Sequence, residues 1–153
     1  MAVDSATPCV FCKIIRGELT PGVVAFCDDH TAVFPSLHQQ PRNLGHMLVV
    51  PARHVERIYD VDGELAGPLM TTLARVAAAV KLAFGADGVS IRQNNDRAGG
   101  QDVFHVHFHV IPRFAGDGFV ALDRALGAVE VPLDERIEQA KKFSRALNFA
   151  SSS

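Results

Sequence analysis

Three histidines alternate with apolar residues in the segment Phe-His-Val-His-Phe-His-Val-Ile-Pro, which spans residues 104–112. In a strand, successive side chains point to opposite faces, so one face of this segment carries imidazoles and the other carries Phe and Val. Imidazole exchanges its proton near neutral pH, attacks phosphorus or carbon, and binds transition metals. A lone histidine in a strand is usually structural, but three in register beside an apolar row indicate a functional site.

One metal ion does not bind all three of these histidines, His105, His107 and His109. Neighbouring side chains on one strand face lie roughly 6.7 Å apart and the outer pair roughly 13 Å apart, whereas a zinc–imidazole bond is about 2 Å long. A single ion therefore binds two neighbours at most. At least one histidine remains for another role.

The triad and three segments before it resemble the signature of the histidine triad (HIT) superfamily of nucleotide hydrolases and transferases. The four segments are Cys9-Val-Phe-Cys12-Lys-Ile-Ile-Arg-Gly-Glu, Gly45-His46-Met-Leu-Val-Val-Pro51-Ala-Arg-His54, Asn94 through Gly99-Gly100-Gln101, and His105-Val-His107-Phe-His109-Val-Ile. They occur in the family order from about residue 8 to residue 115. The resemblance implies a HIT-type fold and a purine nucleotide substrate.

Length and composition suit one compact enzyme domain. The chain has 153 residues, of which 48% are hydrophobic and 21% charged, enough for one core. We expect a single HIT domain over 1–153, with a core at 8–115 and a C-terminal helical extension at 118–150. The formal charge of −2 provides no basic surface for nucleic acid, and we find neither an apolar run of about 18 residues nor a signal peptide. We therefore expect a cytoplasmic protein that binds neither nucleic acid nor membranes.

Apolar periodicity and turn residues predict an α+β fold with an antiparallel sheet of about five strands. The expected strands are 23–26, 31–34, 47–50, 89–92 and 105–111. A helical turn is expected at 11–16, a long helix from Asp62 to Gly85, and a final helix from Pro132 to Asn148. Pro68 fits the long helix only near its first turn. HIT proteins of this size commonly pair as twofold dimers, and the apolar stripe from Leu65 to Phe84 offers a surface for a homodimer.

The resemblance implies catalytic roles for three histidines. His107 would attack the α-phosphorus of a nucleotide and give a nucleotidyl-histidine that water cleaves. A carbonyl group that holds one ring nitrogen of His107 would fix its tautomer and make the other nitrogen more nucleophilic. His109 would contact the phosphate oxygens, and His46 is the supporting histidine of the family. Spacing alone does not distinguish attack on phosphorus from attack on an acyl carbon.

Substrate-binding roles follow from the same resemblance. Asn94 would hold ribose or phosphate, and Gly100 and Gln101 would line the phosphate site, because glycine lets backbone N–H groups approach an anion closely. Asp102 departs from the Ser or Thr that is common in the family, and an ionised carboxylate there would repel phosphate. His38 stands where members often have Asp or Asn beside the ribose, although it also fits an exposed loop. The base would meet apolar side chains that fit a core equally well, namely Phe11, Ile14 and Ile15.

Cys9 and Cys12 form a Cys-x-x-Cys pair. In a cytosolic protein such a pair is a redox centre, half of a zinc site or two free thiols. In the zinc-bearing branches of the superfamily, the two further ligands stand at the positions of His54 and His105. The resemblance therefore implies a closed, structural Zn²⁺ site, with a metal-free fold as the alternative. His107 and His109 would remain available for catalysis.

The resemblance favours the small, Hint-like bacterial branch of the family. The expected activity is cleavage at the α-phosphate of purine nucleoside phosphoramidates or related nucleotides. Asn94 favours this branch, because the branch that cleaves dinucleoside polyphosphates often has Gln there. One alternative is a diadenosine polyphosphate hydrolase. The other is a nucleotide-binding regulatory protein with weak catalysis, an alternative that Asp102 and His38 keep open.

Overall fold

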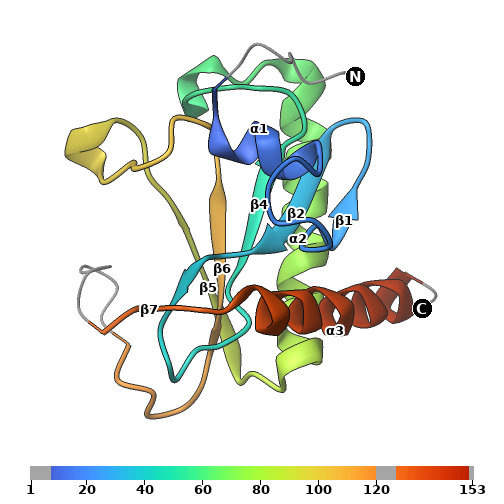
Figure 1. The fold of residues 1–153 in the computed structure, drawn as a ribbon, viewed down its shortest axis with the longest axis vertical. Helices are drawn as coiled ribbons and strands as arrows, with labels where there is room; N and C mark the ends of the chain where they lie inside the picture. Colours follow the sequence, from blue (N-terminus) through green and yellow to red (C-terminus); the bar gives the residue numbers. More distant parts are fainter. Residues whose placement is uncertain (1–7, 120–126, 152–153) are drawn as a thin grey trace.

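The computed structural model describes residues 8–119 and 127–151, and Figure 1 shows how their helices pack around a central sheet. Within these residues the sheet has five antiparallel strands, in the order β1 (Phe26–Cys27), β2 (Thr31–Pro35), β4 (Met47–Pro51), β6 (Phe108–Arg113) and β5 (Gly88–Gln93). A separate pair joins β3 (His38–Gln39) to β7 (Val129–Glu130). The expected α+β fold with an antiparallel sheet of about five strands is confirmed.

The long helix α2 (Gly63–Phe84) covers one face of this sheet. Asp62 caps its first turn by accepting a hydrogen bond from the Leu65 backbone N–H at 3.1 Å, and Gly85 ends it in the left-handed conformation at φ 62°, as these residue types favour. Pro68 lies inside the helix without ending it. The helix boundaries expected from the sequence are confirmed to within one residue.

The apolar stripe of α2 is buried, so it is not the dimer surface that the sequence suggested. Leu65, Leu69, Leu73, Val76 and Val80 are at most 4% exposed and pack with sheet residues in the main core cluster. These five residues cover the sheet and are not available to a second subunit, whereas Phe84 at the end of the stripe is half-buried. By length and composition α2 also resembles a membrane-spanning helix, but a buried core helix satisfies the same test.

The opposite face of the sheet carries the short helix α1 (Val10–Ile15) and the histidines. A second apolar cluster joins Phe11 and Ile14 of α1 to Phe34, Leu48 and Val50 of the strands. Leu48 pairs with His109 across β4 and β6, whereas Val110 belongs to the cluster under α2. The alternation seen in the sequence therefore separates a core face from a histidine face, as expected.

The C-terminal helix α3 (Leu133–Ser151) packs against α2 and β2, as Figure 1 shows in red. Its buried residues Phe143, Ala146 and Leu147 join the main core cluster, and the Ser144 hydroxyl donates to the Ala25 carbonyl at 2.7 Å. Near the start of the helix, Gln139 accepts a hydrogen bond at 2.8 Å from the side-chain amide of Gln39. The helix is thus part of the folded core.

Three details of the expected fold are wrong. β6 begins at Phe108, so His105 and His107 precede the strand instead of lying in it. The first strand is Phe26–Cys27, three residues later than expected, because its pairing with β2 runs only from Phe26 to Cys27. The sequence analysis also missed β3 and β7 and two 3₁₀ turns, Ile58–Asp60 and Arg97–Gly99.

Candidate active site

His107 is held by a backbone carbonyl in the orientation that a nucleophile needs. Its Nδ1 lies 2.7 Å from the carbonyl oxygen of His105, and a carbonyl only accepts, so Nδ1 carries the proton and donates. The lone pair of Nε2 then faces the cavity. The backbone of this segment is anchored by a 2.7 Å hydrogen bond from the Val106 N–H to the Val55 carbonyl. The ring is only 2% exposed, so its environment is fixed by the fold.

His46 and His109 form a direct pair beside His107. His46 Nε2 and His109 Nδ1 lie 2.9 Å apart, and the ring centroids of His107 and His109 lie 5.0 Å apart. Burial, followed by the neighbouring imidazoles, lowers the pKa of His109 to about 2, because a charged ring loses its hydration there. His109 is therefore neutral at physiological pH and can share a proton with His46.

Gly45 brings His46 into place at the start of β4. Its φ is 106°, and an added Cβ would lie 2.5 Å from the Phe84 ring, so both the conformation and the close approach require glycine. The Gly45 N–H donates to the Gln39 side-chain oxygen at 2.9 Å. Because Gln39 also binds Gln139, α3 braces the loop that positions His46.

Asp102 places a carboxylate next to His107. One carboxylate oxygen lies 3.5 Å from His107 Nε2, and the Asp102 side chain is 40% exposed. A positive charge on His107 would be stabilised there, whereas a phosphate group approaching Nε2 would be repelled. The unusual residue noted in the sequence is therefore part of the site.

A cavity of about 250 Å³ opens onto these histidines. Phe11, Ile14 and His38 line it, whereas Ile15 packs against the second apolar cluster instead, and a role of these side chains toward the base or ribose stays a prediction. The Phe11 ring stands edge-on to His107, with centroids 5.2 Å apart. Sequence reasoning missed other lining residues from four further segments, which include Thr20, Ser36, Leu37, Val103 and Arg136. Arg136 comes from α3, which lies outside the four segments that carry the family resemblance, so no sequence motif marks it.

Three expected substrate residues lie in the loop before the triad but do not line this cavity, namely Asn94, Gly100 and Gln101. The side-chain oxygen of Gln101 accepts from the Asp96 N–H at 2.8 Å, and its amide nitrogen donates to the Glu56 carbonyl at 2.7 Å. Its side chain therefore holds the loop together. Asn94 makes a long 3.5 Å contact with the Gly100 carbonyl. Their roles toward substrate stay predictions.

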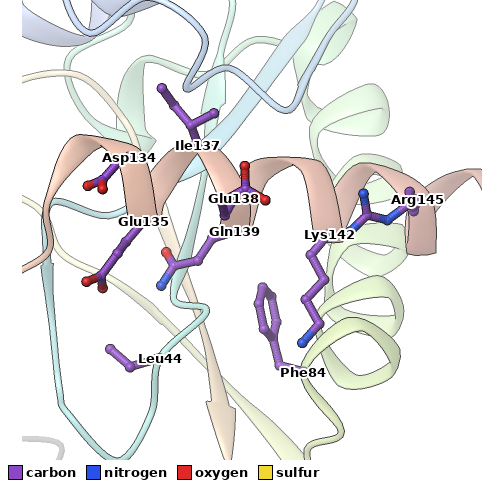
Figure 2. A pocket seen from close by; sticks show the side chains of 9 residues that line it. All are labelled: Leu44, Phe84, Asp134, Glu135, Ile137, Glu138, Gln139, Lys142 and Arg145. Atoms are coloured by element: carbon purple, nitrogen blue, oxygen red, sulfur yellow. The ribbon is translucent and has the colours of Figure 1, made fainter.

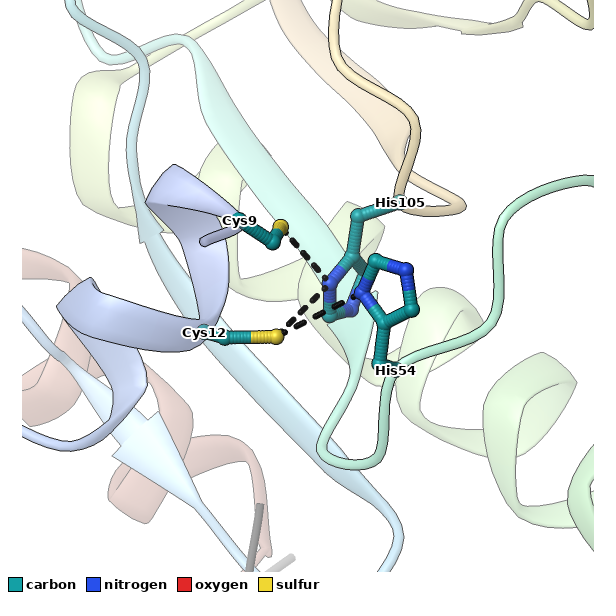
Figure 3. A group of neighbouring side chains, drawn as sticks. All are labelled: Cys9, Cys12, His54 and His105. Carbon is teal, nitrogen blue, oxygen red and sulfur yellow. Dashed lines mark hydrogen bonds between the residues drawn. The ribbon is translucent and has the colours of Figure 1, made fainter. Parts of the chain in front are cut away.

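The structure brings Cys9, Cys12, His54 and His105 together in one cluster, as Figure 3 shows. Cys9 Sγ and Cys12 Sγ lie 3.5 and 3.6 Å from His105 Nδ1, and Cys12 Sγ lies 3.5 Å from His54 Nδ1. The two cysteines come from the start of α1, and the two histidines come from loops before η1 (Ile58–Asp60) and β6. Residues 96 positions apart thus meet at one point.

The donor atoms of this cluster fit a tetrahedral ion. With metal–sulfur bonds of about 2.3 Å and metal–nitrogen bonds of about 2.05 Å, the sulfur–nitrogen edge of a tetrahedron is about 3.6 Å. The three sulfur–nitrogen distances above match that edge, and all four donors lie within 4.8 Å of one another. His105 Nε2 lies 2.8 Å from the Pro51 carbonyl oxygen, the kind of contact that orients a metal-binding imidazole. The four residues can therefore hold a metal ion.

Sequence comparison finds relatives over most of the chain. The HIT domain family model matches residues 18–116. An uncharacterized HIT-like protein of Methanocaldococcus jannaschii is 44% identical over 135 residues, which cover 87% of this chain and 98% of that protein. The adenosine 5′-monophosphoramidase of Saccharomyces cerevisiae is 36% identical over 105 residues, which cover 69% of this chain and 62% of that protein.

Solved structures agree with these sequence matches. A HIT-like protein of Bartonella henselae superposes with a TM-score of 0.79 at 34% identity and covers 95% of this chain and 99% of its own. A zinc-bound histidine triad family protein of Mycobacterium smegmatis superposes with a TM-score of 0.78 at 29% identity, covering 95% of this chain and 96% of its own. The likeness in these structures extends beyond the residues that the family model matches, to α3.

Proposed function

We propose, from the premise that this chain belongs to the HIT domain family, that it is a cytoplasmic nucleotide hydrolase acting at the α-phosphate of purine nucleoside phosphoramidates. The observation that carries the proposal is the orientation of His107, whose Nδ1 is held at 2.7 Å by the His105 carbonyl oxygen. This contact leaves Nε2 as the only ring nitrogen able to attack. The phosphoramidase activity named for the yeast relative supports the choice of substrate.

In the proposed reaction, His107 Nε2 attacks the α-phosphorus and the bond from phosphorus to the leaving amine breaks. The amine takes a proton from solvent, and His107 becomes a cationic nucleotidyl-histidine that keeps its Nδ1 proton. Asp102, 3.5 Å from Nε2, stabilises this cation. Water then attacks phosphorus and loses a proton to solvent. The bond to Nε2 breaks, so the 5′-mononucleotide leaves and neutral His107 returns.

His46 and His109 act as a neutral, hydrogen-bonding pair in this scheme. Because the pKa of His109 is held near 2, the pair brings no positive charge that would compete with the cation on His107. In this scheme one ring N–H lies between the two rings, and a ring N–H of His109 donates to a phosphate oxygen, which polarises the phosphorus. The roles expected for His109 and His46 are therefore compatible with their 2.9 Å contact.

The ion in the cysteine–histidine cluster is proposed to be a structural Zn²⁺. Two thiolates and two imidazoles at tetrahedral spacing suit zinc, and the solved Mycobacterium smegmatis relative is described as zinc-bound. All four positions of the tetrahedron are filled by side chains, so no coordination site is left for a reacting water. When bound, zinc would tie α1 to the loops that carry His54 and His105.

The test of the proposed activity is a direct comparison of two substrates. Purified protein is incubated with adenosine 5′-monophosphoramidate and, separately, with diadenosine polyphosphates, and release of AMP is followed by chromatography. We expect a kcat/KM at least tenfold higher for the phosphoramidate. A preference for the diadenosine compounds would favour the second enzyme class, and no turnover of either would favour a nucleotide-binding regulatory protein.

A homodimer is proposed through the β5 edge of the sheet. Among the strands of residues 8–119 and 127–151, β5 has a neighbour on one side only, and its Ile91 is 48% exposed, so its outer edge can continue the sheet into a second copy. Light scattering should then give about twice the 16.5 kDa of one chain. A mass near 16.5 kDa at micromolar concentration would exclude this dimer.

A further inference from the structure

Arg136 is a buried cation in the wall of the nucleotide cavity. It belongs to α3, beyond the end of the family match at residue 116, yet it lines the same cavity as His107 and His109. The residue is 6% exposed. Burying a guanidinium is costly unless its donors find acceptors, so the partners of this side chain must be accounted for.

Those donors are mostly unused by the described residues. The Nε–H donates to the Val131 carbonyl at 3.2 Å. Glu130 acts on the charge only through space, without an ion-pair contact among the residues that the structure describes. The two terminal NH₂ groups have no hydrogen-bond acceptor in the same part of the chain. The fork of Arg136 therefore presents donors that a ligand in the cavity can satisfy.

A second polar group in the cavity wall lacks a partner as well. The Thr20 hydroxyl oxygen is buried and makes no hydrogen bond within the described residues, and Thr20 has a φ of 48°. Thr20 and Arg136 belong to neighbouring segments, because a Cβ at Gly22 would lie 3.5 Å from Ile137 on α3. Two independent side chains thus bring unsatisfied hydrogen-bonding groups to one cavity.

Arg136 and Thr20 come from segments other than those that carry the histidines of the cavity. The phosphate belongs beside His107 and His109, where the cation that acts on His109 is Arg92. Arg136 instead follows Val131, whose N–H donates to the Leu37 carbonyl at 2.9 Å. Leu37 lines the cavity together with the apolar side chains of α1. Arg136 and Thr20 therefore line the cavity with Leu37 and the apolar side chains of α1, which are the side chains expected to meet the base.

We propose that Arg136 determines base specificity and selects guanine, while Thr20 adds affinity for either purine, an inference that rests on the proposed nucleotide site. Guanine offers two acceptors, O6 and N7, on the edge that a forked guanidinium fits, whereas adenine offers one acceptor and one amino donor there. Adenine would leave one NH₂ of Arg136 facing a donor. The Thr20 hydroxyl donates or accepts, so it supplies affinity without choosing between the purines.

Equilibrium binding of GMP and AMP, measured by titration calorimetry on the full-length protein, tests the proposal without requiring turnover. A bidentate Arg–guanine pair discriminates by roughly 5- to 150-fold, so wild-type protein should bind GMP tighter than AMP by a factor in that range. Arg136→Met should abolish the preference, because it removes the donors and keeps an unbranched stem. Arg136→Lys keeps the charge and should still lose most of the preference.

Two further variants separate recognition from folding. Arg145→Met makes the same change on the outer side of α3, where Figure 2 shows Arg145 beside the hollow lined by Leu44, Phe84 and Lys142, and it should leave the preference unchanged. Thr20→Val keeps the β-branched shape, and so the backbone strain, while it removes the hydroxyl. It should weaken both nucleotides alike.

Equal binding of GMP and AMP, a preference for AMP, or a GMP preference that survives Arg136→Met would each overturn the inference. Tighter binding of adenosine 3′,5′-bisphosphate than of AMP, lost in Arg136→Met, would overturn it too, because Arg136 would then bind a second phosphate. Phosphoramidate turnover without base preference would sink this inference alone. A GMP preference without any turnover would support it and sink the proposed activity alone. Binding of neither mononucleotide would overturn both.

Discussion

His105 and His107 lie two residues apart and serve two different sites. Each ring is fixed by one backbone carbonyl, at 2.8 Å from His105 Nε2 and 2.7 Å from His107 Nδ1. The remaining nitrogen of His105 faces two thiols at 3.5 and 3.6 Å, whereas that of His107 faces a cavity. The two rings share residue type and tautomer control, and the surroundings of the remaining nitrogen distinguish their proposed roles, which are metal binding for His105 and attack on phosphorus for His107.

The largest expected effect comes from removing the nucleophile. His107→Ala should lower kcat for a nucleoside phosphoramidate on the order of 10⁴-fold, about 5.5 kcal/mol of activation free energy, because no other imidazole has a free nitrogen in its place. Bound metal and melting temperature should stay near wild type, because His107 is not one of the four clustered donors. Rapid quench of wild type should trap an acid-labile nucleotidyl-histidine that the variant lacks.

His30→Ala is the matched control, because His30 is exposed and outside both sites. It should retain full activity. If His107→Ala keeps a tenth of the wild-type rate, the covalent mechanism is wrong and the cavity at His107 is better described as a binding site.

The next largest effect should come from the cysteine–histidine cluster. Cys12→Ser removes a buried donor and should release the metal and lower the free energy of unfolding by several kcal/mol, because a structural ion is part of the folding free energy. Elemental analysis should fall from near one zinc per chain to near zero, and the melting temperature should fall with it. Cys27→Ser changes an exposed thiol outside the cluster and should change neither quantity. Wild-type protein that is metal-free and melts unchanged in Cys12→Ser would refute a structural zinc.

The two sites also differ in how far the sequence predicts them. Spacing and resemblance identified all four clustered donors, because a Cys-x-x-Cys pair and two histidines are few and chemically distinctive. They did not predict that the strand starts only at Phe108. An alternating pattern looks the same whether or not the backbone pairs, and here the segment before Phe108 leaves the ladder so that His105 reaches the cysteines.

The sequence predicts features that depend on local residues and misses those that depend on distant partners. Asp62 and Gly85 marked the ends of α2 because caps are local chemistry. β3 and β7, of two residues each, are held by partners about 90 positions away, and so local residues do not announce them. Arg136 lies in the polar first turns of a helix, where a charged residue ordinarily faces solvent, and only the packing of α3 on the cavity reveals its burial.

Acid should weaken the fold through His109, which is buried beside His107. The pKa of His109 falls from 6.5 to about 2 on folding, chiefly because of burial, so below pH 6.5 the unfolded chain binds a proton that the folded chain does not. This depressed pKa gives stability that is present above pH 6.5 and is lost as the pH falls toward 2. The loss from this group between pH 7 and pH 5 should be about 2 kcal/mol.

Urea denaturation of wild type and His109→Gln at pH 7, 6 and 5 isolates this contribution, because the metal ligands titrate alike in both proteins. The difference in unfolding free energy between the two should shrink as the pH falls. A difference that stays constant with pH would mean that His109 is not held neutral by its surroundings.

The smallest expected effect concerns the carboxylate of Asp102, which lies beside His107. Asp102→Asn keeps the size of the side chain and removes the carboxylate 3.5 Å from His107 Nε2. The phosphate should bind more tightly without this repulsion, and the cationic intermediate should lose stability, so KM and kcat should fall together. Because the side chain is 40% exposed, solvent screens the charge, and each change should be on the order of 1 kcal/mol, or about fivefold. Steady-state kinetics at low and high salt should show the two proteins converging as salt rises. A kcat that falls without any change in KM would instead make Asp102 a proton donor or acceptor, since a carboxylate that acts by charge alone influences the bound phosphate as well as the intermediate.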